Sequence, residues 1–146
     1  MNIIKQIQDS DGNNIYPIGY AQGGMKMDLL WTNPSPTSDF ASQTLSIDLS
    51  DYDYIYVVQR QYKDSSGNAT ATMIPKDGST YVVTVISDGG GVRTRTYSAS
   101  ASSVAISVGK EGTTTNNAYA IPYQIYGIKM SYIVPTSVHG LQYVEV

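Results

Sequence analysis

The 146-residue chain contains no cysteine and a single histidine, His139. The absence of cysteine excludes disulfides, thiolate metal ligands and a cysteine nucleophile. One histidine near the C-terminus leaves every other part of the chain without the usual general base. The Gly-x-Ser-x-Gly sequence that carries the nucleophile of many hydrolases is also missing. We therefore expect a protein that is not an enzyme, with no catalytic residues, no metal and no cofactor.

Charge and long apolar runs are also scarce. Charged residues make up 14% of the sequence, and the formal net charge is −3. A nucleic-acid-binding protein carries a basic footprint that this composition lacks, so we expect no nucleic-acid partner. No apolar run approaches the length of a membrane span, and the first residues lack the apolar segment of a signal peptide. We expect synthesis in the cytoplasm, without a signal peptide, and no membrane insertion.

Helical periodicity is missing as well. No segment keeps apolar residues three and four positions apart over three turns, so helix is expected only as one turn around residues 37–42. Turn-forming residues recur instead, and short strand-like runs lie between them. The turn clusters are residues 9–14, 63–68, 75–79, 87–91 and 109–112.

The runs between these turns differ in pattern. Residues 45–49 and 104–108 alternate apolar and polar side chains, which predicts half-buried strands. Residues 54–62 and 81–86 are β-branched and aromatic on both faces, which predicts central strands. Residues 92–97 alternate threonine with arginine, which favours a solvent-facing edge strand.

These patterns predict an all-β fold: an antiparallel β-sandwich, jelly-roll-like in its strand count, with a short N-terminal hairpin or arm. We expect the arm in residues 1–24 and the sandwich in residues 25–146. Asn33-Pro34-Ser35-Pro36 predicts a stiff corner, because both prolines fix φ and restrict the residues before them. Trp31 and Phe40 are then expected to close one end of the sandwich.

Thirteen of the fifteen aromatic residues are tyrosines. Tyrosine packs a ring while its hydroxyl holds water or a ligand, and sugars bind to aromatic faces flanked by amides and carboxylates. One cluster of this kind combines Tyr119 and Tyr123 with Asn116, Asn117 and Gln124, and a second combines Tyr62 with Gln59, Arg60 and Gln61. Arg93 and Arg95, beside Tyr97, are candidates for binding anionic groups such as phosphate or uronate. Cross-strand pairing and subunit contacts are the alternative roles for all these residues.

Two stretches resemble modules of tail-fibre and receptor-binding proteins from phages of Gram-positive gut bacteria. They are LLWTNPSPTSDFASQTLSIDLSDYDYI (29–55) and NNAYAIPYQIYGIK (116–129), and DSDGNNIYP (9–17) is similar to a leader of tail and baseplate proteins. The resemblance implies a non-enzymatic phage or prophage virion protein. Its implied partners are itself, as a homotrimer, other virion tail proteins and a host cell-surface polysaccharide.

Two alternatives remain open. The tyrosines fit equally well a carbohydrate-binding module of a secreted glycan-active protein, which would be a monomer. Asp48, Asp51 and Asp53 form the densest carboxylate group, and Asp51 with Asp53 would suit a glycosidase or metal pair. The same carboxylates also fit a role at the start of the strand that follows them.

Overall fold

The computed structural model describes residues 7–8, 11, 14–15, 24–64 and 67–131. The chain divides into two compact units, Met1–Gly24 with Ser131–Val146, and Met25–Met130. The domain boundaries expected above remain a prediction. The strands are β1 (Ile7–Gln8), β2 (Asn14–Ile15), β3 (Gly24–Thr32), β4 (Gln43–Ser46), β5 (Tyr54–Tyr62), β6 (Ala69–Pro75), β7 (Thr80–Ile86), β8 (Val92–Ala99), β9 (Ser103–Ile106), β10 (Lys110–Glu111), β11 (Thr114–Thr115) and β12 (Tyr119–Ser131).

In the first unit, β1 and β2 form a short antiparallel hairpin. Ile7 lies opposite Ile15, and Gln8 lies opposite Asn14. This pairing agrees with the hairpin form of the expected N-terminal hairpin or arm. The rest of the expected arm, apart from residues 11 and 24, lies outside the described residues.

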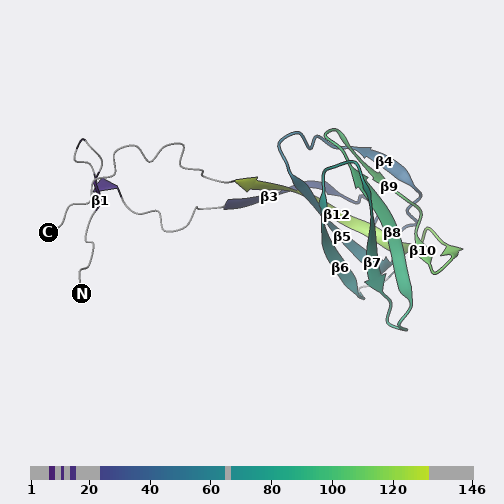
Figure 1. Cartoon of the computed structure of the whole chain (residues 1–146). Coiled ribbons are helices and arrows are strands. Elements are labelled where there is room, and N and C mark those ends of the chain that lie inside the picture. The colour runs from purple at the N-terminus through teal and green to yellow at the C-terminus, as the bar shows by residue number, and fades with distance from the viewer. Residues whose placement is uncertain (1–6, 9–10, 12–13, 16–23, 65–66, 132–146) are drawn as a thin grey trace, which may run out of the picture. The chain divides into compact units, whose positions relative to one another are not determined.

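The second unit is an antiparallel β-sandwich (Figure 1), which confirms the expected fold class. One sheet has the strand order β3-β12-β5-β6. The other has the order β11-β10-β8-β9-β4, and β7 pairs with the free side of β8. Among the described residues, eight longer strands are thus split four and four between the sheets. The antiparallel pair β5–β6 lies in the first sheet, and the pairs β7–β8, β8–β9 and β10–β11 lie in the second.

Strands β7 and β8 do not occupy the positions in the sheet that their composition indicates. The Arg-rich strand β8 is interior to its sheet, since it pairs with β7 and with both β9 and β10. Among the described residues, the apolar strand β7 pairs only with β8 and leaves Val82 and Ile86 exposed. The edge prediction for β8 and the central prediction for β7 were wrong, because arginine can be buried when backbone carbonyls surround its guanidinium.

The core forms where the inner faces of the two sheets meet. The alternation in residues 104–108 and 45–49 is confirmed by Val104, Ile106, Ile47 and Leu49, which are all buried. Strand β5 buries alternate residues along its whole length. The core residues are Phe40, Ile47, Leu49, Ile55, Val57, Ile74, Val83, Tyr97, Ala99, Val104, Ile106, Ile121 and Ile125.

The proline corner closes one end of this core. The buried side chain of Asn33 donates a hydrogen bond to the carbonyl of Pro122 (2.8 Å) and accepts one from the Ser35 N–H (2.9 Å). Trp31 and Phe40 meet edge to face with ring centroids 6.1 Å apart, and Trp31 packs against the core to which Phe40 belongs. The helical turn expected around residues 37–42 was wrong, because the described residues contain no helix. The chain forms a turn there instead, in which the Ser38 N–H donates to the Ser35 carbonyl.

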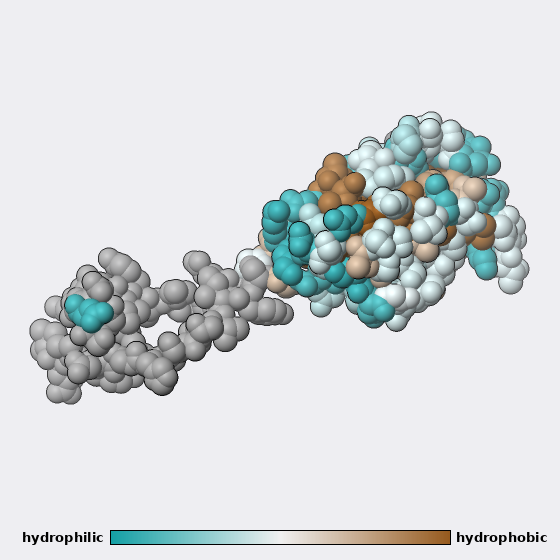
Figure 2. Space-filling view, turned by 90° about the horizontal axis from the view of Figure 1, so that it is seen from above, coloured by the Kyte–Doolittle hydropathy of each residue, from teal (hydrophilic) through white to brown (hydrophobic). Residues whose placement is uncertain are grey.

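The solvent side of the sheet β3-β12-β5-β6, here called the outer face, carries several exposed apolar side chains. Met25, Met27 and Leu29 alternate along β3 and are 59%, 49% and 52% exposed. On β6, Met73 is 46% exposed and lies opposite Tyr56 of β5, which in turn lies opposite Tyr126 of β12. Figure 2 shows hydrophobic side chains at the surface of the sandwich among hydrophilic and neutral ones.

Candidate functional site

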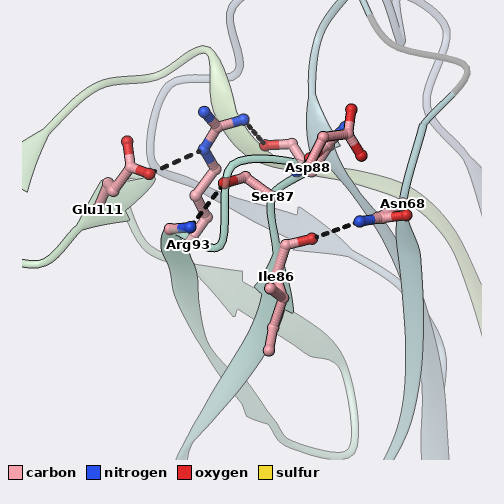
Figure 3. Close-up of polar contacts among 8 residues, drawn as sticks. Asn68, Ile86, Ser87, Asp88, Arg93 and Glu111 are labelled. Carbon is pink, nitrogen blue, oxygen red and sulfur yellow. Dashed lines mark hydrogen bonds and ion pairs between the residues drawn. The ribbon is translucent and has the colours of Figure 1, made fainter.

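A polar hollow of about 520 Å³ opens where the end of β5 meets the β7–β8 turn and the short strand β10. Its wall combines an aromatic ring, two carboxylates, one guanidinium, an amide and two glycines. These groups fit a polar ligand better than an apolar one. The lining residues, of which several are shown in Figure 3, are Gln61, Tyr62, Ser87, Asp88, Gly89, Gly91, Arg93 and Glu111.

Arg93 is the central cation of the hollow. Antiparallel pairing of β10 with β8 places Glu111 opposite Arg93, and the Glu111 Oε1 lies 3.5 Å from the Arg93 Nε. The guanidinium also donates a 3.3 Å hydrogen bond to the Gln61 carbonyl. At 3.5 Å the Glu111 carboxylate attracts the guanidinium without hydrogen-bonding to it, and the buried Nε has no hydrogen-bond partner. An Arg93 side chain only 17% exposed thus keeps one unused donor.

Two tyrosines support Arg93 from the four-stranded sheet. Tyr62 and Tyr119 are direct neighbours across β5 and β12, and their ring centroids are 5.9 Å apart. The Arg93 guanidinium carbon lies 4.5 Å from the centroid of Tyr119 and 5.4 Å from that of Tyr62. Cation–π contacts of this kind hold the guanidinium in place.

A paired set of hydrogen bonds fixes the β7–β8 turn beside the hollow. The Gln61 side chain donates to Asp88 Oδ2 (2.8 Å) and accepts from the Asp88 N–H (2.9 Å). The Ser87 hydroxyl accepts from the Gly91 N–H (2.9 Å), and Asn68 donates to the Ile86 carbonyl (3.0 Å). In the view of Figure 3, Glu111 and Asp88 lie on opposite sides of Arg93. The turn that carries Asp88 is therefore anchored to β5.

Arg95 was expected at a ligand surface, and the structure buries it at 1% exposure. Its guanidinium donates to the carbonyls of Ser107, Asn117 (3.1 Å), Tyr119 (3.2 Å) and Ala120 (2.8 Å). Burial lowers the pKa of Arg95 to about 10. Arg95 therefore ties the start of β12 and the residues just before it to β8, and it is not available to phosphate or uronate.

Tyr97 is also removed from the candidate ligand contacts, because it is fully buried. Its hydroxyl donates to the Gln59 Oε1 (3.0 Å), and the Gln59 amide donates to the Val83 carbonyl (3.0 Å). Burial raises the pKa of Tyr97 far above its usual range. This polar chain crosses the core between the two sheets.

The remaining candidates lie apart from the hollow's lining. The Arg60 guanidinium carbon lies 3.9 Å from the ring centroid of Tyr123, and Gln124 accepts a hydrogen bond from Tyr126 (3.0 Å). Asn116 accepts from the Ala118 N–H (2.9 Å), which caps the turn before β12. Asn117 holds a buried side-chain oxygen without a partner. Their role in binding a saccharide remains a prediction.

The carboxylate group at residues 48–53 has structural partners. Asp53 Oδ2 accepts from the Met130 N–H (2.9 Å), and Asp48 accepts from the Ser50 N–H (2.9 Å). Both hydrogen bonds lower the pKa of the carboxyl that accepts them. Across the described part of the chain, no group of three His, Cys, Asp or Glu side chains is arranged to hold a metal ion. In that same part, no helix is long and apolar enough to cross a membrane.

Sequence reasoning selected Tyr62, Tyr119, Arg93 and Gln61 but not the acidic side of the hollow. Asp88 and Glu111 lie in the clusters at 87–91 and 109–112, whose composition indicates only turns. The one available signal was the opposite charge of Arg93 and Glu111, and it becomes informative only with the register of β10 against β8. Comparison of the chain with protein-family models, curated proteins and solved structures gives no significant match.

Proposed function

We propose that this chain is a non-enzymatic structural module of a phage or prophage virion. In this proposal it belongs to a tail fibre or baseplate, assembles as a homo-oligomer and contacts a polysaccharide of the host cell surface. The resemblance of residues 29–55 and 116–129 to tail-fibre and receptor-binding modules supports it, as does the confirmed β-sandwich. The proposal needs two surfaces, one for assembly and one for recognition.

The apolar outer face is the observation that carries the proposal. Monomeric proteins rarely expose contiguous apolar patches of large area, and such patches mark interaction sites. Met25, Met27 and Leu29 present one side of β3 to solvent while Leu30 packs against the core. A second copy that covers these side chains would remove them from water.

Light scattering on the full-length protein tests the assembly. We expect a mass three times that of one chain, and a lower mass when Met27→Lys and Leu29→Lys are combined. The matched control is Val82→Lys, which places a charge on β7 of the other sheet at a position that is 63% exposed. A wild-type protein that remains a monomer at all concentrations would contradict the proposal.

The carbohydrate-binding module of a secreted protein is the second candidate. The hollow favours it as much as it favours the virion protein, because Tyr62, Asp88 and Glu111 offer the groups that hold a sugar. The two candidates differ in their expected oligomeric state. A protein that is a monomer in solution and binds soluble glycans would favour the carbohydrate-binding module over the virion protein.

A further inference from the structure

We infer that the polar hollow binds a non-anionic sugar unit and discriminates against uronate and phosphate groups. This inference rests on the proposed recognition of a cell-surface polysaccharide and names the chemistry of the ligand. It also replaces the expectation that Arg93 selects an anion.

The charge balance of the hollow is the first argument. Asp88, Arg93 and Glu111 are its charged lining residues, which gives two carboxylates against one guanidinium. Glu111 already pairs with Arg93. A carboxylate or phosphate group of a ligand would be repelled by the carboxylates of both Asp88 and Glu111. Like charges brought together at a binding surface cost several kcal/mol. An uncharged or amine-bearing sugar avoids this repulsion.

The partly exposed Glu111 carboxylate is the second argument. The Glu111 side chain is 31% exposed, and its Oε1 lies 3.5 Å from the Arg93 Nε, which is too long for a good hydrogen bond. A hydroxyl group can donate a hydrogen bond to this carboxylate. An ionised carboxylate or a fully ionised phosphate has no proton to donate to Glu111. The carboxylate is therefore matched to a ligand group that donates, as a sugar hydroxyl does.

The aromatic wall is the third argument. The Tyr62 ring lines the hollow and is held by its contacts with Tyr119 and Arg93. Aromatic rings give the apolar face of a sugar a surface to pack on, while the carboxylates serve its hydroxyls. Because the ring and the guanidinium are fixed before a ligand arrives, little side-chain ordering is needed on binding.

Two glycines of the lining provide a matched pair of variants. A Cβ on Gly91 would lie 1.9 Å from Glu111 Oε1, so Gly91→Ala forces the carboxylate aside without changing any charge. A Cβ on Gly89 would meet nothing within 4 Å. Gly91→Ala therefore tests the position of the Glu111 carboxylate, and Gly89→Ala controls for an added methyl group in the same turn.

Isothermal titration of the full-length protein provides the test. The probes are neutral tetrasaccharides of glucose, galactose, mannose and N-acetylglucosamine, a glucosamine tetramer and a galacturonate tetramer. We expect at least one non-anionic probe to bind about tenfold or more tightly than the galacturonate tetramer. Glu111→Gln, which keeps the shape, should weaken that binding about tenfold through loss of a charge-assisted hydrogen bond. Gly91→Ala should weaken it as well, while Gly89→Ala and the remote Asp51→Asn should not.

The opposite results overturn the inference. They are tightest binding of the galacturonate tetramer, binding of none of the probes, or binding that Glu111→Gln and Gly91→Ala leave unchanged. Thermal unfolding of each variant shows whether it is folded. An oligomer that still binds cell walls but shows any of these three results retains the proposed function and loses only this inference.

Discussion

The Tyr97 hydroxyl of one sheet donates a 3.0 Å hydrogen bond to the Gln59 side chain of the other, in the centre of the core. The Gln59 side-chain amide in turn donates a hydrogen bond to the Val83 carbonyl. A buried polar chain of this kind is satisfied only when strands β5, β7 and β8 are correctly placed. It therefore specifies how the two sheets pack.

Tyr97→Phe should destabilise the protein. The substitution keeps the ring but leaves the Gln59 Oε1 buried without its donor, at a cost of about 1 to 3 kcal/mol in the free energy of unfolding. Urea denaturation at neutral pH measures this loss. Tyr126→Phe is the matched control, because its hydroxyl bonds to Gln124 at a half-buried position. Equal stability of Tyr97→Phe and the wild type would mean that the hydrogen bond across the core contributes nothing.

The contribution of Tyr97 to stability should fall at alkaline pH. Burial raises the pKa of Tyr97, so its contribution is complete below the ordinary tyrosine pKa of about 10 and is lost as the pH rises beyond it. Arg95 acts in the opposite direction, since its lowered pKa relieves the cost of burying a charge above about pH 10. Melting temperatures from pH 8 to 11 should show the stability advantage of the wild type over Tyr97→Phe shrinking above about pH 10. An advantage that grows with pH would refute this assignment.

Arg95→Lys should also cost stability despite the retained charge. The guanidinium reaches four carbonyl groups at residues 107, 117, 119 and 120, and an ammonium group cannot match this planar arrangement of donors. We expect a loss of about 2 to 4 kcal/mol from the carbonyls left unpaired. Urea denaturation again provides the measurement, with Arg60→Lys on the partly exposed side of β5 as the control. If Arg95→Lys lowers the free energy of unfolding no more than Arg60→Lys does, the hydrogen bonds from Arg95 to the four carbonyls do not stabilise the protein as proposed.

Asp53 should contribute to stability at neutral pH but not in strong acid. The Met130 N–H, helped by Lys129, lowers the pKa of the Asp53 carboxyl, so its contribution is present above the ordinary aspartate pKa and is lost as the pH falls through the lowered value. Asp53→Ala should therefore be less stable than the wild type at pH 7, with the difference shrinking toward about pH 2. Asp51→Ala, at an exposed position two residues away, is the control for removing a carboxyl group from the same segment. A difference that stays constant with pH would contradict the assignment.

Local patterns predicted the fold class well, because a half-buried strand has apolar side chains at every second residue, on the face that points into the core. Ile47, Leu49, Val104 and Ile106 are examples. The order of strands within a sheet has no such signature. Sequence alone makes Arg95 look like a solvent-facing residue, because the carbonyls around the start of β12 reach its guanidinium only in the tertiary structure.

The sequence predicted which residue types could bind a ligand, but not which of these residues lie together in the folded protein. Tyr62 and Tyr119 were selected in separate clusters, and only the register of β5 against β12 makes them neighbours. Asp88 and Glu111 were hidden because acidic residues are common in turns. Their role depends on the β7–β8 turn and on the pairing of β10 with β8, which place both carboxylates in the same hollow as Arg93.

Co-sedimentation with isolated cell walls tests the central claim of surface recognition most directly. The full-length protein is mixed with sacculi from a panel of Gram-positive gut bacteria, and the pelleted fraction is measured for the wild type, Glu111→Gln and Gly89→Ala. We expect the wild type and Gly89→Ala to pellet with the sacculi of at least one host, and Glu111→Gln to pellet less. A wild-type protein that stays in the supernatant with every preparation would contradict recognition of the host surface.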